Sequence, residues 1–301
     1  MKSIYPALIL SFITLFLFSC GPTISSKDEQ AFKTSKAKME EKLDNPEKEN
    51  LEKALRVIVL KAMKEKWNFP EKYKEKSFDK ISMEMIDGKS YSAIISFAEE
   101  FLAADRDEKI ANKTAEIDSL EKDKLKAAKI TQQIDAFKLT KISISEDQFF
   151  SDDPKSPFLD LTFKNTSKED IIGEYMINIE VYSKKTGEKL AAQGSGGTWN
   201  DDFALKPNES YDYHQPVFNE AVQHSTLWKT AKYPITDFSP YDLVIKAYAT
   251  KITTKKGGTI ESPKADAAYF DAEIKKLNEE IKGLKETKAT LDELELTDKN
   301  R

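Results

Sequence analysis

The sequence holds few of the residues on which most catalytic and metal sites depend. Of its 301 residues, one is cysteine, two are histidine and ten are glycine. A single cysteine excludes an intramolecular disulfide, and His214 and His224 without a second thiol do not form a zinc-ligand pattern. Positive charge is not in excess either, because 47 lysines and arginines face 52 aspartates and glutamates. The sequence therefore predicts no metal site and no nucleic-acid binding.

Motifs for covalent catalysis and for cofactors are also missing. No serine lies in a G-x-S-x-G pattern, and Gly194-Ser195-Gly196-Gly197 lacks the Lys-Ser/Thr of a phosphate-binding loop, so we interpret it as a loop or bulge at a sheet edge. Asp152-Asp153 and Asp201-Asp202 do not fit a calcium-binding EF-hand. Paired carboxylates for glycoside hydrolysis stay open, because their separation is spatial. We expect a protein that is not an enzyme and has no cofactor.

An apolar run that ends at the only cysteine dominates the N-terminus. The run spans Ile4–Phe18 and follows one positive charge at Lys2, and the cysteine is Cys20. It is shorter than the ~20 residues of a transmembrane helix and has the length of the apolar core of a secretory signal. The alternatives are a buried core cysteine or an uncleaved anchor helix.

Leu17-Phe18-Ser19-Cys20 resembles the lipobox of bacterial lipoproteins, with Phe18 bulkier than the usual residue. The resemblance implies that residues 1–19 are a removed signal peptide, that Cys20 is lipidated with chains such as palmitate, and that residues 20–25 form a tether. Two or more acyl chains hold a protein stably on a bilayer, so the membrane is a partner through Cys20. Gly21 stands where an aspartate marks inner-membrane retention, which favours the outer membrane. The periplasmic face and the cell surface both stay open.

Residues 26–104 carry apolar positions at helical spacing and predict a small helical bundle. Ser26 and Glu29 predict a capping box for the first helix, and Asn45-Pro46 predicts an N-cap and first-turn proline for the second. A shorter helix is expected over Phe78–Ile86, ended by Asp87-Gly88.

The lipobox, two amphipathic helices and the segment Asp87-Gly88-Lys89-Ser90 followed by Ile94-Ile95 resemble a family of small bacterial lipoproteins of uncharacterised function. The resemblance covers about the first third of the chain. It implies no activity.

Two stretches, residues 105–136 and 263–296, have heptad-like apolar seams. The first seam is Ile117, Leu120, Ala127 and Ile134; the second is Ala267, Phe270, Ile274, Leu277, Ile281, Leu284 and Leu291. Neither helix buries its seam alone. We predict that they flank the sheet region and pair antiparallel as a coiled coil. The alternative is that the C-terminal helix binds a partner or its own copy.

Between them, residues 137–262 show the alternation of half-buried strands. Turn sequences occur at Lys184-Lys185-Thr186-Gly187, Lys206-Pro207-Asn208-Glu209 and Lys255-Lys256-Gly257-Gly258 and predict hairpins. Short strands with such turns predict an antiparallel β-sandwich, so the fold class is α+β. The run from Leu159 to Leu190 is similar to immunoglobulin-like domains of bacterial lipoproteins.

Aromatic residues give the only candidate ligand site. Trp199 is expected in a polar loop, and Trp228, Tyr211 and Tyr213 are not far off in sequence; together they are a possible surface for glycans or peptides. The alternative is that these rings are buried and fill the ends of the hydrophobic core of the sandwich. We expect a lipid-anchored envelope protein with a structural or protein-interaction role. The second hypothesis is a glycan- or peptide-binding sandwich.

Overall fold

The structure of the chain is a computed structural model that describes residues 21–199, 203–217 and 232–295, and it has the mixed α+β architecture that the sequence predicts. The expectations for Cys20, His224, Trp228 and Asp201-Asp202 lie outside the described residues.

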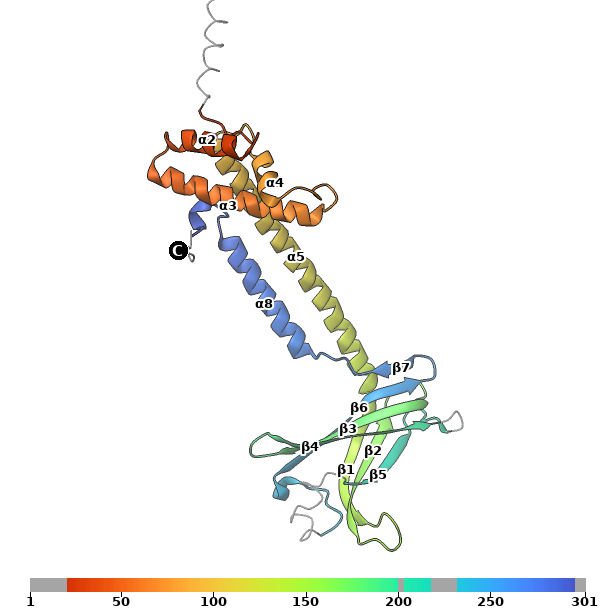
Figure 1. Cartoon of the computed structure of the whole chain (residues 1–301). Coiled ribbons are helices and arrows are strands. Elements are labelled where there is room, and N and C mark those ends of the chain that lie inside the picture. Colours follow the sequence, from red (N-terminus) through yellow and green to blue (C-terminus); the bar gives the residue numbers. More distant parts are fainter. Residues whose placement is uncertain (1–20, 200–202, 218–231, 296–301) are drawn as a thin grey trace, which may run out of the picture. The chain divides into compact units, whose positions relative to one another are not determined.

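The chain divides into two compact units, which we call unit 1 and unit 2. Unit 1 comprises Met1–Ile117 and Lys275–Arg301, and unit 2 comprises Asp118–Ile274. Two helices, α5 (Tyr91–Ile134) and α8 (Ala267–Glu286), each contribute residues to both units (Figure 1).

The first helix of unit 1, α2 (Glu29–Glu40), begins two residues later than a cap at Ser26 predicts. Its N-cap is Asp28, whose Oδ1 accepts a hydrogen bond from the Ala31 N–H at 2.7 Å. The Ser26 N–H instead donates to Asp87 Oδ1 at 2.8 Å. The expected capping box is therefore wrong, because Ser26 is engaged in a contact with a distant residue.

Helix α3 (Asn45–Asn68) is capped by Asp44, one residue before the expected Asn45. The Asp44 side chain accepts from the Glu47 N–H at 2.9 Å, and the Asp44 N–H donates to the Glu47 carboxylate at 3.0 Å. The proline is in the first turn as expected. Ser77 caps the short helix α4 (Phe78–Met85), which ends one residue before the predicted Ile86.

The core of unit 1 is aliphatic. Its fully buried side chains include Leu51, Ile58 and Ile94, and alanines at positions such as Ala54 and Ala98 let the helices approach closely. Aromatic rings lie at its margin, where Lys61 Nζ is 5.1 Å from the centre of the Phe101 ring and lysines cover other rings. Helix α5 is one continuous helix, so the bundle helix and the predicted separate helix over 105–136 are parts of the same element.

Within unit 1, α8 runs antiparallel to α5. The Arg106 guanidinium donates to the Thr287 carbonyl at 3.2 Å, and Lys113 forms an ion pair with Glu280. The later residue of α5 therefore contacts the earlier residue in the C-terminal segment, as in an antiparallel pair. In unit 2, Lys124 forms an ion pair with Asp271.

Helix α8 ends earlier than the predicted residue 296. Ala289 has a left-handed φ of 55°, and the Glu293 carboxylate accepts the Ala289 N–H at 2.9 Å. A 3₁₀ turn, η4 (Leu291–Glu293), follows and buries Leu291 in the core of unit 1. The last apolar position of the heptad pattern therefore belongs to a turn.

Unit 2 contains two antiparallel sheets. The three-stranded sheet has the order β1 (Phe137–Asp147), β2 (Ser156–Asn165) and β5 (Ser210–Pro216). The four-stranded sheet has the order β4 (Lys189–Trp199), β3 (Gly173–Ser183), β6 (Leu243–Thr254) and β7 (Gly258–Glu261). A short 3₁₀ helix, η3 (Ser239–Tyr241), precedes β6.

Two of the three expected hairpins are present, between β3 and β4 and between β6 and β7. The turn at Lys206–Glu209, closed by a hydrogen bond from the Glu209 N–H to the Lys206 carbonyl, is not a hairpin. It lies between β4 and β5, which belong to different sheets. A local turn sequence does not specify which strands pair on either side of it.

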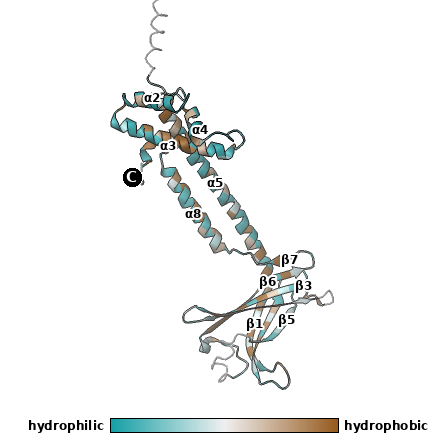
Figure 2. Cartoon of the chain, in the orientation of Figure 1, coloured by the Kyte–Doolittle hydropathy of each residue, from teal (hydrophilic) through white to brown (hydrophobic). Residues whose placement is uncertain are grey.

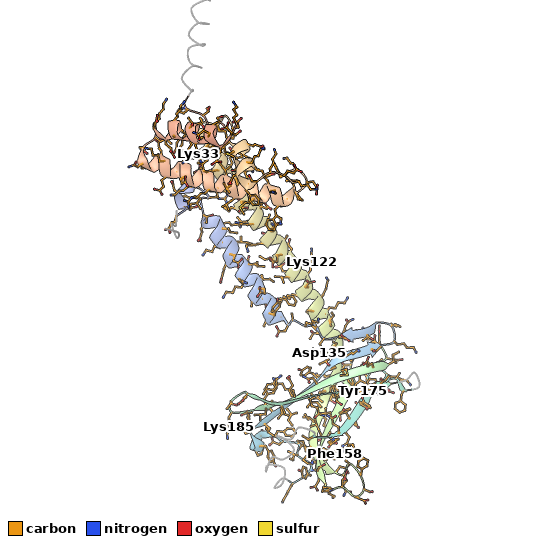
Figure 3. All side chains as sticks on the ribbon, viewed as in Figure 1. Lys33, Lys122, Asp135, Phe158, Tyr175 and Lys185 are labelled. Atoms are coloured by element: carbon orange, nitrogen blue, oxygen red, sulfur yellow. The ribbon has the colours of Figure 1, made fainter. Side chains whose placement is uncertain are left out.

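One hydrophobic cluster is shared by both sheets of unit 2, and aromatic rings occupy its centre. Phe137 and Phe163 stack with ring centres 4.7 Å apart, and Tyr175 packs edge-on against Phe137 at 5.9 Å. Hydrophobic residues are prominent on the strands, whereas α8 is mostly hydrophilic (Figure 2). Tyr175 lies on β3 and belongs to this cluster, whereas Phe158 on β2 is not part of it (Figure 3).

Candidate functional site

The best candidate site lies between β4 and β5, the edge strands that face each other across the two sheets of unit 2. We call it the β4–β5 seam. Its inward-facing side chains are Gln193, Ser195 and Trp199 on β4 and Tyr211, Tyr213 and Gln215 on β5. Because successive strand residues point to opposite faces, every second residue of each strand contributes.

Trp199 closes one end of the seam. It is the last residue of β4, not part of a loop as the sequence suggested, and only 7% of it is exposed. Its ring stacks on Tyr175 at 4.0 Å and packs edge-on against Tyr211 at 5.2 Å. A ring packed on both sides in this way contributes to the core and offers no free face to a sugar.

Tyrosine hydroxyls form a polar line along the seam. The Tyr175 hydroxyl is 3.1 Å from that of Tyr211, Ser195 hydrogen-bonds to the Tyr213 hydroxyl, and this hydroxyl donates to Gln215 Oε1 at 2.6 Å. Burial raises the pKa of Tyr175 and of Tyr213. Both phenols therefore stay protonated at neutral pH and act as hydrogen-bond donors.

The glycines of β4 explain how the strand packs against Tyr175. A Cβ on Gly197 would lie 2.8 Å from the Tyr175 hydroxyl, and one on Gly196 would lie 2.3 Å from the Tyr175 carbonyl oxygen. A Cβ on Gly194 would meet nothing within 4 Å. The pairing of β4 with β3 has an unbroken register from Ala191 to Trp199, so the predicted sheet edge is present but the glycines mark no bulge.

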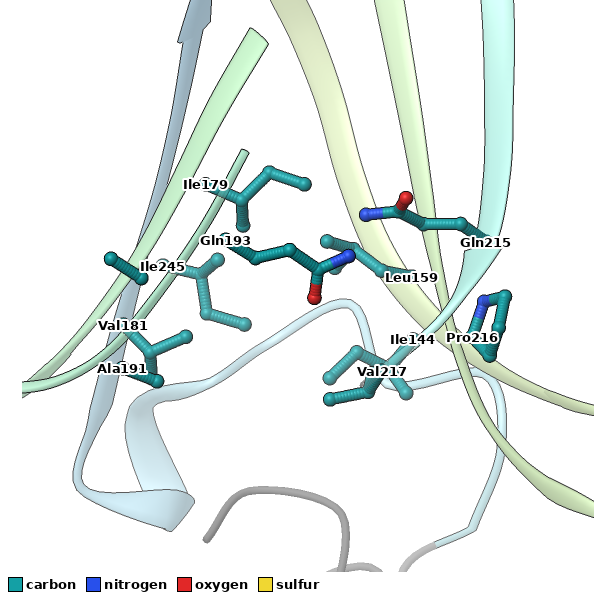
Figure 4. Close-up of a pocket in the computed structure, with 11 residues that line it drawn as sticks. Ile144, Leu159, Ile179, Val181, Ala191, Gln193, Gln215, Pro216, Val217 and Ile245 are labelled. Atoms are coloured by element: carbon teal, nitrogen blue, oxygen red, sulfur yellow. The ribbon is translucent and has the colours of Figure 1, made fainter. Parts of the chain in front are cut away.

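The other end of the seam opens into a small cavity between the sheets. Its volume is about 30 Å³, and aliphatic side chains such as Ile179 and Leu159 line it. The carboxamides of Gln193 and Gln215 extend toward each other from opposite sheets at its mouth (Figure 4). This volume matches one water molecule and is far below the ~300–1,000 Å³ of ordinary small-molecule sites. The cavity fits a methyl-sized group.

The two carboxamides have unused hydrogen-bonding capacity. Gln215 is 7% exposed and its Oε1 accepts from Tyr213, but no described residue accepts a hydrogen bond from its Nε2. The Gln193 carboxamide has no hydrogen-bond partner among the described residues. Neither carboxamide has an atom that is both fully buried and unpaired, but a polar group placed between them would find free donors and acceptors to hydrogen-bond with.

A second polar cluster lies on the outer face of the three-stranded sheet. His214 Nδ1 is 2.5 Å from Asp160 Oδ1, and its Nε2 is 3.1 Å from Asp147 Oδ2. The imidazole also stacks on Phe158, with ring centres 4.6 Å apart. The pKa of Asp147 is lowered, first by a hydrogen bond from the Gln148 N–H and then by His214. With both ring nitrogens on carboxylates, the imidazole has no nitrogen left to activate a nucleophile.

Trp199, Tyr211 and Tyr213, which the sequence analysis grouped with Trp228, lie close together in the structure, but sequence reasoning did not single out Gln193 or Gln215. Both glutamines occupy inward positions of their strands, so period-two alternation marks them as buried polar residues. That β4 and β5 face each other is not encoded in this alternation.

Within the described parts of the chain, no group of three or more histidine, cysteine or acidic side chains is arranged to hold a metal ion. No helix of these parts has both the length and the apolar character needed to span a bilayer. Comparisons of the chain with protein-family models, curated proteins and solved structures found no match.

Proposed function

We propose that the protein is a lipid-anchored bacterial envelope protein with a non-enzymatic structural or protein-interaction role. The observation that carries the proposal is the sequence Leu17-Phe18-Ser19-Cys20, which ends a short apolar run with the only cysteine of the chain. A lipidated Cys20 would hold the protein on the membrane, on the periplasmic face or the cell surface of the outer membrane.

The start of unit 1 supports a short tether. Thr23 forms a β-bridge with Ser90, and the Ile24 N–H donates to the Lys89 carbonyl at 3.0 Å. Ile24 is 1% exposed and belongs to the core of unit 1. The four residues 20–23 lie between the lipid and Ile24, and four extended residues span at most ~14 Å. A lipid on Cys20 would therefore keep unit 1 close to the bilayer surface.

For the architecture, we propose an immunoglobulin-like sandwich for the two sheets of unit 2 and an antiparallel coiled coil for α5 and α8. The shared hydrophobic cluster of the two sheets supports the sandwich. The ion pairs Lys113–Glu280 and Lys124–Asp271 support the helix pairing.

Exposed apolar residues of unit 1 favour an interaction role. Leu60, Met63 and Trp67 lie three and four residues apart on α3, with exposed fractions of 57%, 37% and 82%. Side chains at this spacing share one helix face, and exposed apolar faces are typical of protein contacts.

A second candidate function is a glycan- or peptide-binding sandwich. The burial of Trp199 argues against stacking on sugars, and the open carboxamides of Gln193 and Gln215 favour a peptide, whose backbone matches an amide in both donors and acceptors.

Replacing the cysteine tests the anchor. The wild-type chain, Cys20→Ala and the control Ser11→Ala, which alters the apolar run but keeps the cysteine, are expressed in a bacterium and labelled with radioactive palmitate. We expect label and membrane association in the wild type and the control, and loss of both in Cys20→Ala. Retention of label and membrane association by Cys20→Ala would refute the anchor.

A further inference from the structure

The four edge strands of unit 2 differ in how they are protected against pairing with another strand. Natural sheets protect their edges with short strands, charged residues, proline or bulges, because free N–H and C=O groups otherwise pair with another chain. Strand β7 is only four residues long. Strand β1 has charged residues and a register shift between Leu139 and Lys141, and β5 has Asp212, His214 and Pro216.

Strand β4 has charge and a register shift only at its first residue, Lys189, and none of these features from Leu190 on. The segment Leu190–Trp199 contains no charged residue and no proline, and its pairing with β3 is regular from Ala191 on. Its second edge pairs with no strand among the described residues. Gly194, Gly196 and Gly197 also allow a second backbone to approach closely.

The seam next to this edge has the chemistry of a peptide site. A strand added to β4 directs every second side chain into the space between the sheets, where the 30 Å³ cavity lies. Its peptide groups pass the carboxamides of Gln193 and Gln215, which face each other across the mouth. The Ser195–Tyr213 hydrogen bond closes the seam on one side, so the open stretch lies at Ala191–Gln193.

We propose that β4 binds an extended peptide segment of a partner protein as an additional strand, with an alanine-sized side chain in the cavity between Gln193 and Gln215. The peptide backbone completes the hydrogen bonds of the β4 edge and of the two carboxamides. This proposal rests on the protein-interaction role proposed above and specifies its partner as an uncharged, extended segment.

The seam favours a single peptide over a second copy of this chain. Tyr213 and Gln215 of β5 face β4 directly across the seam, so the incoming strand must fit beside both sheets. A second copy that paired through its own β4 would also bring its second sheet, with its own β5, beside this copy's β5. A lone extended segment brings no such second sheet.

The first experiment uses the full-length chain in lipid nanodiscs as the target for a phage library of random ten-residue peptides. We expect enriched peptides with low charge and an alanine at a fixed position. Each is then synthesised with a backbone N-methyl group at successive positions. In an added strand, every second N–H group donates to β4, and an N-methyl group removes that hydrogen bond. We therefore expect methylation at these positions to weaken binding about 2- to 10-fold and methylation at the positions between them to have little effect.

Hydrogen exchange locates the binding strand without any variant. A saturating peptide is expected to slow exchange of alternate amides within Lys189–Trp199 and to leave β7, the other edge of the same sheet, unchanged. The proposal would be overturned if no peptide is enriched, or if the peptide protects amides elsewhere than in β4. It would also be overturned if the β4 amides are fully protected before peptide is added, or if the chain forms a stable dimer that the peptide does not dissociate.

A charge placed in the seam provides the variant test. Gln193→Lys introduces an inward-pointing charge of the kind that protects natural edges, and we expect peptide binding to fall at least about ten-fold. Thr259→Lys places the same charge on β7 and is expected to bind like the wild type. Equal binding by both variants would overturn the proposal, and thermal unfolding checks that both are folded. The outcome is independent of palmitate labelling, so a failed peptide site leaves the lipid anchor to its own test.

Discussion

Unit 1 and unit 2 fill their cores with different side chains. The core of unit 1 is aliphatic with buried alanines, and its aromatic rings lie at the margin beneath lysines such as Lys61. The core of unit 2 is built around Phe137, Phe163, Tyr175 and Trp199. Helices approach closely where their contact residues are small, whereas sheets pack ~10 Å apart and leave room for large flat rings. The spacing between elements therefore decides where aromatic residues are buried.

The two units also differ in how they use charge. Unit 1 caps α2 and α3 with aspartates and links α3 to α5 through Lys64, which is 2.6 Å from Asp105 and 2.7 Å from Glu108. Unit 2 also has ion pairs, but along the β4–β5 seam it has a partly buried line of uncharged hydroxyls and amides. We expect unit 1 to respond to pH and capping substitutions and unit 2 to respond to the loss of a ring.

The largest expected effect is the loss of an aromatic ring from unit 2. Phe163 is 0% exposed and stacks on Phe137, so Phe163→Ala removes a full ring contact and leaves a cavity. Such a change costs about 3–5 kcal/mol, a large part of the stability of an ordinary domain. Residue-resolved hydrogen exchange is expected to show faster opening of β2 and β3.

The same experiment tests whether the units are separate in stability. We expect α2, α3 and α4 to keep their wild-type exchange rates in Phe163→Ala, because their core contains no residue of unit 2. Equal acceleration of both units would contradict this. Phe149→Ala, which removes a ring that is 56% exposed, is the control and is expected to change stability by less than about 0.5 kcal/mol.

A smaller effect is expected from a helix cap of unit 1. Asp44→Ala removes the side chain that accepts the Glu47 N–H and leaves the reciprocal bond unsupported. Loss of an N-cap costs about 1 kcal/mol, and the opening of α3 measured by hydrogen exchange is expected to show it. Asp44→Asn keeps the acceptor and is expected to change little. An equal loss in both variants would mean that the charge, not the hydrogen bond, stabilises the helix start.

Most elements were predictable from the sequence because their signals are local. The alternation along β2 and β3 and the helical spacing from Tyr91 onward follow from which face of an element is buried. Boundaries were less predictable. Ser26 did not become a cap because Asp87, 61 residues away, binds its N–H. Helix α8 ended early because Leu291 is buried in unit 1 through a 3₁₀ turn.

The candidate site was only half predictable. Trp199, Tyr211 and Tyr213 stood out by residue type, but whether their rings lie inside or outside depends on which strands become sheet edges. Gln193 and Gln215 are unremarkable in the sequence and become notable only because β4 and β5 face each other in different sheets. Pairing of strands distant in sequence depends on the whole core, which no local pattern contains.

The smallest expected effect, a dependence of stability on pH, distinguishes the units through Asp105. This carboxyl lies between Lys64 and Lys109, at 2.6 and 2.7 Å. Partial burial tends to raise its pKa, but the hydrogen bonds and charges of the two lysines outweigh burial and leave the pKa below its ordinary value. The pKa of Lys64 is raised, first by its hydrogen bond to Asp105.

The sign of the effect follows from these two directions. A lowered carboxyl pKa stabilises the fold above the unfolded value of ~3.9, and this stabilisation is lost as the pH falls through the lower folded value. A raised lysine pKa stabilises the fold below ~10.4, and this is lost as the pH rises through the higher folded value. The pair is therefore fully effective between these limits. Because both side chains are partly exposed, Asp105→Asn is expected to cost no more than ~1 kcal/mol at pH 7.

This dependence is measured by unfolding unit 1 in urea at pH values from 2 to 8. The hydrogen exchange of the α3 amides reports the unfolding at each pH. The difference between the wild type and Asp105→Asn is expected to shrink toward zero at the acid end, because the protonated aspartate no longer pairs with Lys64. Asp107→Asn, at a more exposed carboxylate of the same helix, is the control and is expected to follow the wild type throughout. A constant difference for Asp105→Asn across the whole range would show that side-chain packing, and not charge, links α3 to α5.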